Sequence, residues 1–230
     1  MNKKLAIIIV VIILTILGVG TLVTLSNKTK KDLKIDELNT KPNNNSEEEN
    51  QDSSVLEANS NILVVYFSKT GENYGVGTVE VGNTALMANY IKDYLNADIF
   101  EIIPVKEYPN DYKTATEIAK TEQEQNARPK IKNKLENLNS YDTIFIGYPI
   151  WWGDLPMIVY TFLESYDFRG IKIIPFNTHE GSRNAGTYNT IKSKLKTSNV
   201  ETNGLAIQGK VARTDEGKTR TINWLKELGY

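Results

Sequence analysis

The stretch that decides the fold is Ile62-Leu63-Val64-Val65-Tyr66-Phe67, which runs directly into Ser68-Lys69-Thr70-Gly71. An uninterrupted apolar and aromatic run closed by Ser, Thr and Gly is typical of a strand that is buried on both faces and ends in a polar loop. Hydroxyls and backbone N–H groups suit a phosphate at this point, because the following helix begins with unpaired amide donors and a partial positive charge. The stretch therefore predicts a phosphate-binding loop at the end of a central strand.

Downstream of this loop, short apolar runs alternate with amphipathic segments. The predicted strands are 62–67, 98–103, 143–147, 171–176 and 204–208. The predicted helices are 84–95, 111–126, 157–165, 187–196 and 215–228. Strands that are apolar on both faces and joined by crossover helices predict an α/β fold, with a parallel sheet covered by helices on both faces. Five strands fit the doubly wound order 2-1-3-4-5 better than the six-stranded dinucleotide arrangement, and ligands should lie outside the carboxyl ends of the strands.

Three regions are predicted along the chain: 1–25, 26–60 and 61–230. Leu5–Leu25 is apolar and free of charge, and as a helix it would be about 31 Å long, enough to cross a bilayer. It is therefore expected to be an N-terminal transmembrane anchor, with a cleaved secretory signal as the alternative. The polar region that follows is expected to be a flexible linker. Lysines flank the apolar run on both sides, so only analogy with signal anchors places the domain on the extracytoplasmic side of the membrane.

Composition excludes several classes of function. The 27 Lys and Arg residues balance 28 Asp and Glu residues, so the chain lacks the strong positive field that nucleic-acid binding usually requires. The chain has no cysteine, which excludes disulfides, thiolate nucleophiles and cysteine-ligated metal centres. Redox chemistry, if present, would therefore need a bound cofactor.

The first loop contributes Ser68, Thr70 and Gly71, and after the insertion Glu72–Val81 it is expected to continue with Asn83 and Thr84. Either of the last two residues would suit the N-cap of the next helix. Gly77–Thr84 reads G-x-x-x-x-G-N-T, but Asn83 stands where a triphosphate-binding loop has lysine, and the glycines lack the dinucleotide spacing. A mononucleotide is therefore favoured, with a plain Ser/Thr/Gly-rich turn as the alternative.

The second loop, Tyr148–Pro156, places Trp151 and Trp152 after the third predicted strand. Indole rings at a strand's carboxyl edge suit a flat heterocycle such as isoalloxazine, with Pro149 limiting the loop's freedom. The alternative is that both tryptophans pack into the core.

The third loop, Asn177–Ser182, contains His179, the only histidine of the chain. Backbone N–H groups of Gly181 and Ser182 could meet the carbonyl edge of a flavin, and His179 could pair with that edge or with the phosphate. A hydrogen-bonded loop residue is the alternative for His179. Carboxylates of Glu180 and Asp154 would oppose negative charge on a reduced flavin.

These loops and the segments around them resemble the flavodoxin-like family, in particular a bacterial subgroup with a W-W-G second loop. The matching segments are Tyr66-Phe67-Ser68-x-Thr70-Gly71, Glu101-Ile102-x-Pro104-Val105-x-x-Tyr108-Pro109, Ala127-Arg128-Pro129, Gly147-Tyr148-Pro149-Ile150-Trp151-Trp152-Gly153, Pro156-Met157 and Pro175-Phe176-x-Thr178-His179-Glu180-Gly181-Ser182. The resemblance covers the domain and neither the anchor nor the linker. The insertion Glu72–Val81 departs from the family's pattern, and Lys69, unusual beside a phosphate, is expected to point to solvent.

The resemblance implies noncovalently bound FMN and electron transfer with redox partner proteins that the sequence does not identify. By the same carry-over, the phosphate would be held by Ser68, Thr70, Gly71, Asn83 and Thr84, the ring would be flanked by Pro149, Trp151, Trp152 and Gly153, and the far side would be completed by Thr178, His179, Gly181 and Ser182. A membrane-tethered electron carrier is the leading interpretation. The alternatives are an NAD(P)H-dependent FMN quinone or nitro-compound reductase, and a binding module without redox function.

Overall fold

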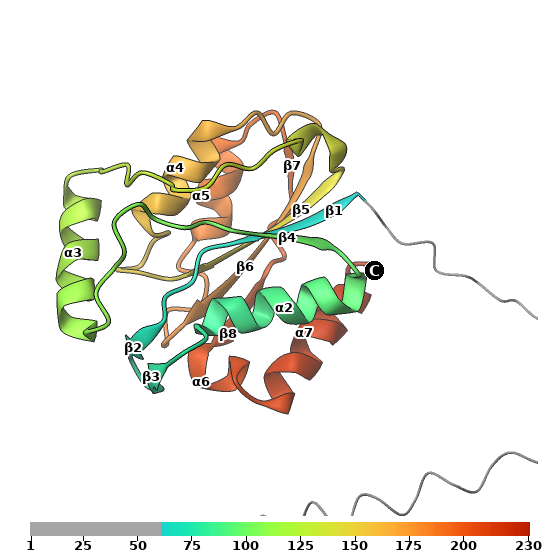
Figure 1. Cartoon of the computed structure of the whole chain (residues 1–230). Helices are drawn as coiled ribbons and strands as arrows, with labels where there is room; N and C mark the ends of the chain where they lie inside the picture. The colour runs from blue at the N-terminus through green and yellow to red at the C-terminus, as the bar shows by residue number, and fades with distance from the viewer. Residues whose placement is uncertain (1–60) are drawn as a thin grey trace, which may run out of the picture. The chain divides into compact units, whose positions relative to one another are not determined.

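A computed structural model describes residues 61–230, which fold as a mostly parallel sheet with helices on both faces (Figure 1). The strands of the main sheet are β1 (Ile62–Tyr66), β4 (Asp98–Glu101), β5 (Thr143–Pro149), β6 (Lys172–His179), β7 (Asn199–Val200) and β8 (Leu205–Gln208). A separate antiparallel pair is formed by β2 (Gly71–Asn73) and β3 (Gly77–Val79). The helices are α2 (Asn83–Leu95), α3 (Tyr112–Glu124), α4 (Met157–Ser165), α5 (Thr187–Lys194), α6 (Gly209–Ala212) and α7 (Asp215–Glu227), with a 3-10 turn at Leu138–Ser140.

The order of the main sheet agrees with the prediction in its first four places, β4-β1-β5-β6, and all these pairs are parallel. The fifth place differs, because β7 and β8 share it. β7 pairs with the start of β6 and β8 with its end, so the four residues 201–204 stand opposite only Ile174 and Pro175. Pro175 has no backbone N–H to donate, and the edge strand bulges past it.

Alternation along β1 shows why every residue of this strand is apolar or aromatic. Leu63, Val65 and Phe67 belong to one hydrophobic core, beneath α4 and α5. Ile62, Val64 and Tyr66 belong to a second core, beneath α2 and α7. Successive side chains of a strand point to opposite faces, so a strand covered on both sides needs apolar residues at every position. Figure 1 shows α2 and α7 on one side of the sheet and α4 and α5 on the other.

The insertion Glu72–Val81, for which no structure was predicted, contributes to the β2–β3 hairpin. Gly71 pairs with Val79 and Asn73 with Gly77, which leaves a three-residue loop. Gly75 in that loop and Gly77 after it both have positive φ, 76° and 74°. A short loop that contains Gly, followed by Thr-Val-Glu-Val, is a known hairpin signal, so the sequence did carry the information.

The predicted membrane location is contradicted by the described residues. Within residues 61–230, no helix is long and apolar enough to cross a bilayer. The apolar helix α4 has nine residues, about 14 Å, whereas a bilayer core is about 30 Å thick. The predicted anchor Leu5–Leu25 and the predicted linker 26–60 lie outside the described residues.

Candidate functional site

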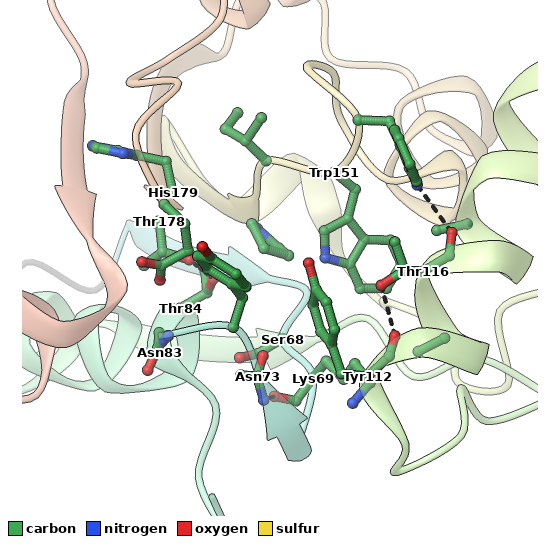
Figure 2. Close-up of a pocket in the computed structure, with 17 residues that line it drawn as sticks. Ser68, Lys69, Asn73, Asn83, Thr84, Tyr112, Thr116, Trp151, Thr178 and His179 are labelled. Atoms are coloured by element: carbon green, nitrogen blue, oxygen red, sulfur yellow. Dashed lines mark hydrogen bonds between the residues drawn. The ribbon is translucent and has the colours of Figure 1, made fainter. Parts of the chain in front are cut away.

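A pocket of about 430 Å³ opens at the carboxyl edge of the sheet and brings the three predicted loops together (Figure 2). This volume lies within the range of roughly 300–1,000 Å³ typical of small-molecule sites. Eight of the predicted site residues line it: Ser68, Asn83, Thr84, Pro149, Trp151, Trp152, Thr178 and His179. Five others lie outside its lining: Thr70, Gly71, Gly153, Gly181 and Ser182.

The first loop and the start of α2 form the polar end of the pocket. The Ser68 hydroxyl accepts a hydrogen bond from the backbone N–H of Ala85, at 3.2 Å. The N-cap of α2 is Gly82, so the expectation that Asn83 or Thr84 would cap this helix is wrong. A Cβ on residue 82 would overlap the Ser68 hydroxyl and the Lys69 carbonyl. Glycine therefore lets the helix start approach the β1 loop closely enough for Ser68 to cap it from outside.

This arrangement leaves donors at the helix start facing the pocket. Asn83 and Thr84 are the first two residues of α2, whose backbone N–H groups have no intrahelical partner, and its first turn carries no acidic residue. The Thr84 hydroxyl is 2.8 Å from the Thr178 hydroxyl, which ties the first loop to the third. The Asn83 side-chain oxygen accepts from Arg213 at 3.1 Å. Despite the ten-residue insertion, both predicted residues thus return beside Ser68.

Lys69 has a structural contact rather than the expected solvent position. Its ammonium donates to the carbonyls of Thr70 at 2.9 Å, Glu72 at 3.0 Å and Asn110 at 3.3 Å. Its pKa is lowered, because burial penalises the charged form more than Glu72 and Asp111 favour it. The lysine therefore ties the first loop to the segment that precedes α3.

Aromatic side chains form the other end of the pocket. Trp151 is half-buried and packs edge-on against Phe67, with ring centroids 5.3 Å apart, and against Tyr108, at 4.9 Å. Trp152 is 50% exposed, and its indole N–H donates to the carbonyl of Thr116 on α3 at 2.9 Å. Trp151 is thus partly a core residue, as the alternative interpretation held, whereas Trp152 stands at the mouth of the pocket.

A tight turn presents Trp152. Trp151 and Asp154 exchange two backbone hydrogen bonds of 3.0 Å across the turn. The central residues, Trp152 and Gly153, have φ values of +50° and +75°. Positive φ at both central positions is the pattern of a type I′ turn, which favours Asn-Gly, and a tryptophan there is conformationally costly. Such a cost is typical of a site where the side chain has a function.

The two carboxylates expected near the ring have different surroundings. Asp154 accepts from the backbone N–H of Leu155 at 2.7 Å and from the Tyr160 hydroxyl at 2.9 Å, and it does not line the pocket. Glu180 does line the pocket. Desolvation raises the pKa of Glu180. The hydrogen bond from the backbone N–H of Gly209 lowers this pKa, but by less than desolvation raises it. Asp154 therefore stabilises the turn and α4, and Glu180 alone of the two adds negative charge to the pocket wall.

His179 lines the pocket, and Figure 2 shows its ring extending away from the other labelled side chains. Its Nδ1 accepts a hydrogen bond from the backbone N–H of Gly181 at 2.9 Å, so the ring proton of the neutral form is on Nε2. Burial lowers the pKa of His179, and the charges of Arg183 and Arg220 lower it further. At neutral pH the ring is therefore an uncharged donor.

Sequence reasoning missed several lining residues that come from the hairpin and from α3. Those residues are Asn73, Tyr74, Tyr112, Ala115, Thr116 and Ala119. The hairpin signal could have revealed Asn73 and Tyr74. No local signal brings α3 to the pocket, because that contact depends on how the segment before the helix folds back onto the hairpin.

The donor set fits a ligand with an anionic group at one end and a flat ring at the other. Hydroxyls and helix-start amides lie at the Ser68 end, and indole and phenol rings lie at the Trp151 end. Within residues 61–230, no group of His, Asp or Glu side chains could hold a metal ion. Phosphate and isoalloxazine groups match the two ends.

This sheet order and this pocket define a flavodoxin-like α/β protein. The chain belongs to the flavodoxin family, because the family model described as Flavodoxin matches residues 61–228. No match is found among curated proteins.

Several solved structures are similar to the chain. A presumed flavoprotein from Bacteroides eggerthii is 30% identical, with 75% of this chain and 99% of that one covered and a TM-score of 0.57. One from Bacteroides uniformis is 28% identical over 73% and 98% of the two chains, with a TM-score of 0.55. A Lactobacillus acidophilus flavoprotein, solved in complex with FMN, is 23% identical over 66% and 95%, with a TM-score of 0.52. The last of these shows likeness of fold only.

Proposed function

We propose that this chain binds FMN noncovalently and transfers electrons as a flavodoxin-like protein. The observation that carries the proposal is the pocket itself, which joins a helix start suited to phosphate with an aromatic wall suited to isoalloxazine. The family membership supports a flavin, and the FMN bound to the Lactobacillus acidophilus flavoprotein suggests which flavin.

The chain's own groups divide into two sets in this proposal. Ser68, Asn83 and Thr84 hold the phosphate through hydroxyl, amide and backbone N–H groups. Trp151 and Trp152 contact the ring, and Pro149 stiffens the strand end beneath them. Thr70, Gly71, Gly153, Gly181 and Ser182 lie outside the pocket lining, so their proposed part is to shape the loops.

Bound FMN would supply one- or two-electron transfer, and the protein would set how easily the ring accepts electrons. A neutral His179 can donate a hydrogen bond but adds no positive charge. Glu180 disfavours extra negative charge on the ring. We therefore expect the pocket to favour oxidised over fully reduced FMN, compared with FMN in water.

Purification of residues 53–230 tests the proposal directly. The expected product is yellow and releases FMN, not FAD, on denaturation. A chain that is colourless and does not quench the fluorescence of added FMN would contradict the proposal. Riboflavin serves as the matched ligand control, because it lacks only the phosphate, and it should bind more weakly than FMN.

A second candidate is an NAD(P)H-dependent reductase of quinones or nitro compounds. The observation in its favour is that Tyr74, Tyr112 and Trp152 are exposed at the mouth of the pocket, where a flat acceptor could bind. Steady-state oxidation of NADPH by the FMN-loaded protein with a quinone acceptor separates the two candidates. Turnover favours the reductase, and bound FMN without turnover favours the electron carrier.

A further inference from the structure

The β2–β3 hairpin is the part of the molecule that the proposed function leaves without a role. Two of its residues, Asn73 and Tyr74, line the pocket. The Asn73 amide donates to the carbonyls of Gly71, at 3.0 Å, and Lys69, at 3.3 Å, so it holds the hairpin against the first loop. Tyr74 is the side chain that this fixed hairpin presents to the ligand space.

The base of the hairpin is fastened to the start of α3. The backbone N–H of Glu72 donates to the Asn110 carbonyl at 2.8 Å, and the Glu72 carboxylate accepts from the backbone N–H of Tyr112 at 3.0 Å. The Lys69 ammonium donates to carbonyls on both sides of this junction. A Cβ on Gly71 would come within 2.7 Å of the Asn110 side chain, so the two segments approach as closely as glycine allows.

The tip of the hairpin reaches the opposite side of the pocket. A Cβ on Gly75 would stand 3.2 Å from a carboxylate oxygen of Glu180, in the third loop. The hairpin therefore extends from α3 to the third loop, past the mouth of the pocket. Figure 1 shows it beyond the carboxyl ends of β1 and β6, next to the start of α2.

Tyr74 is 62% exposed, and its ring contact in the described residues is with Tyr112, at a centroid distance of 5.9 Å and a tilt of 40°. The third loop, Asn177–Ser182, contains no Phe, Tyr or Trp, and its one ring is the imidazole of His179, which Figure 2 shows extending away from the other labelled side chains. The tyrosines that line the pocket are Tyr74 in the hairpin and Tyr112 at the start of α3, so a phenol contact with a bound ring would come from one of these two side chains. A large aromatic side chain left exposed beside a cavity gains area and ring contacts when the cavity fills.

We propose that the hairpin is a cover of the ligand pocket and that Tyr74 packs against the bound flavin and slows its release. This inference rests on the proposed function, since the ligand it names is FMN. Tyr74 is a binding residue here, and the Lys69–Glu72–Asn110 contacts position it.

The rate at which FMN dissociates from the full chain tests whether the hairpin covers the pocket. FMN-loaded protein is diluted far below its dissociation constant, and the recovery of flavin fluorescence gives the dissociation rate. Tyr74→Ala is compared with Tyr74→Phe and with Tyr94→Ala, a matched control because Tyr94 is an exposed tyrosine, 39% accessible, outside the pocket lining.

Tyr74→Ala should release FMN roughly tenfold faster, because most affinity changes within one interface appear in the dissociation rate. Tyr74→Phe and Tyr94→Ala should match the wild type, and the melting temperature of the flavin-free Tyr74→Ala protein should be unchanged. Equal release by Tyr74→Ala and wild type would overturn the cover. Wild type that binds no FMN would overturn the proposed function, and the cover with it.

If Tyr74→Ala is unstable, a second variant tests whether the position of the hairpin affects the release of FMN. Glu72→Ala removes the hydrogen bond to the backbone N–H of Tyr112 at the start of α3, and Glu72 itself does not line the pocket. Faster release with an intact melting temperature supports the cover. Unchanged release would show that the position of the hairpin has no effect on the ligand and would overturn it.

Discussion

His179 shows how neighbouring groups set the protonation state of a single residue. Its Nδ1 is held by the backbone of Gly181, and Arg183 and Arg220 place positive charge nearby. Both effects favour the neutral ring, because an imidazolium has no lone pair to accept from Gly181 and is repelled by the arginines. The remaining N–H on Nε2 is free to donate.

NMR titration of His179 checks this account, and the assignment is simple because the chain has one histidine. The pKa should lie below its ordinary value of 6.5, and the ¹⁵N shifts at pH 7 should identify the form with the proton on Nε2. Arg183→Gln should bring the pKa back toward 6.5. A pKa above 6.5 would contradict the geometry of this loop.

Glu164 is a carboxylate that two cationic side chains hold in the folded state. It accepts from Arg128, at 2.6 and 2.9 Å, and from Lys194 at 2.6 Å. These hydrogen bonds lower the pKa of Glu164 from 4.5 to about 2. Arg128 and Lys194 also stand over the ring of Tyr160, whose hydroxyl holds Asp154, so the cluster leads back to the tryptophan turn.

The lowered pKa makes stability depend on pH in a defined window. The folded state prefers the carboxylate, so its contribution is fully present above about pH 4.5 and is lost as the pH falls toward about 2. Melting temperatures of wild type and Glu164→Gln should therefore differ at pH 6 and converge at low pH. A constant difference across that range would contradict this assignment, and Glu136→Gln is a control in an exposed ion pair.

At the scale of elements, the turn Trp151–Asp154 holds Trp152 in an unfavourable backbone conformation that fixes the position of its indole ring. Trp152 has a positive φ that suits Asn or Gly, yet it keeps a hydrogen bond to Thr116 and a contact of 5.2 Å between its ring and the Lys120 ammonium. Exposed cation–π contacts contribute about 0.5–1 kcal/mol, which offsets part of the roughly 1–3 kcal/mol that such a backbone conformation costs. Stability and ligand binding should therefore separate at this position.

Trp152→Asn tests that separation. Asn suits the left-handed conformation, so the free energy of unfolding of the flavin-free protein should stay within about 1 kcal/mol of wild type. The affinity for FMN should fall at least about tenfold, because the ring loses an aromatic contact. Urea unfolding and fluorescence titration measure the two quantities. A large loss of stability with unchanged affinity would show that Trp152 serves the core.

At the scale of the whole molecule, the sheet separates two cores and gathers the site at one edge. Gly147 lies in the central strand β5, in register with Tyr66 on one side and Phe176 on the other. A Cβ at this position would overlap the ring of Phe176, which is fully buried. The close packing of β5 and β6 sets the spacing of the second and third loops, so this glycine affects fold and pocket together.

Gly147→Ala should destabilise the domain by about 1–3 kcal/mol, since overpacking a filled core forces neighbours off their preferred rotamers. Chemical unfolding monitored by circular dichroism measures the loss. Gly170→Ala is not a neutral control, because Gly170 has a φ of +79°. Ala127→Gly, outside both cores, is the better comparison. Wild-type stability in Gly147→Ala would contradict the packing described for β5 and β6.

The sequence by itself determined five of the six strands of the main sheet, the helices between them and three loops that meet at the pocket. Apolar periodicity is a local property, and the run Ile62–Phe67 must be covered on both faces wherever it lies. The carboxyl ends of parallel strands meet at one edge, so Ser68, Trp151 and Thr178 could be placed together before any coordinates were known.

Only the tertiary structure decided which groups of the protein form hydrogen bonds with the polar side chains of those loops. Lys69 meets Asn110, 41 residues away, and Ser68 rather than a helix residue caps α2. Asp154 turns to Tyr160, and the hairpin brings Tyr74 to the pocket. The physical reason is that a polar side chain needs a hydrogen-bond partner, and many different donors or acceptors in the protein can serve as that partner. Chain segments distant in sequence determine which partner comes within hydrogen-bond distance, and no local pattern records their approach.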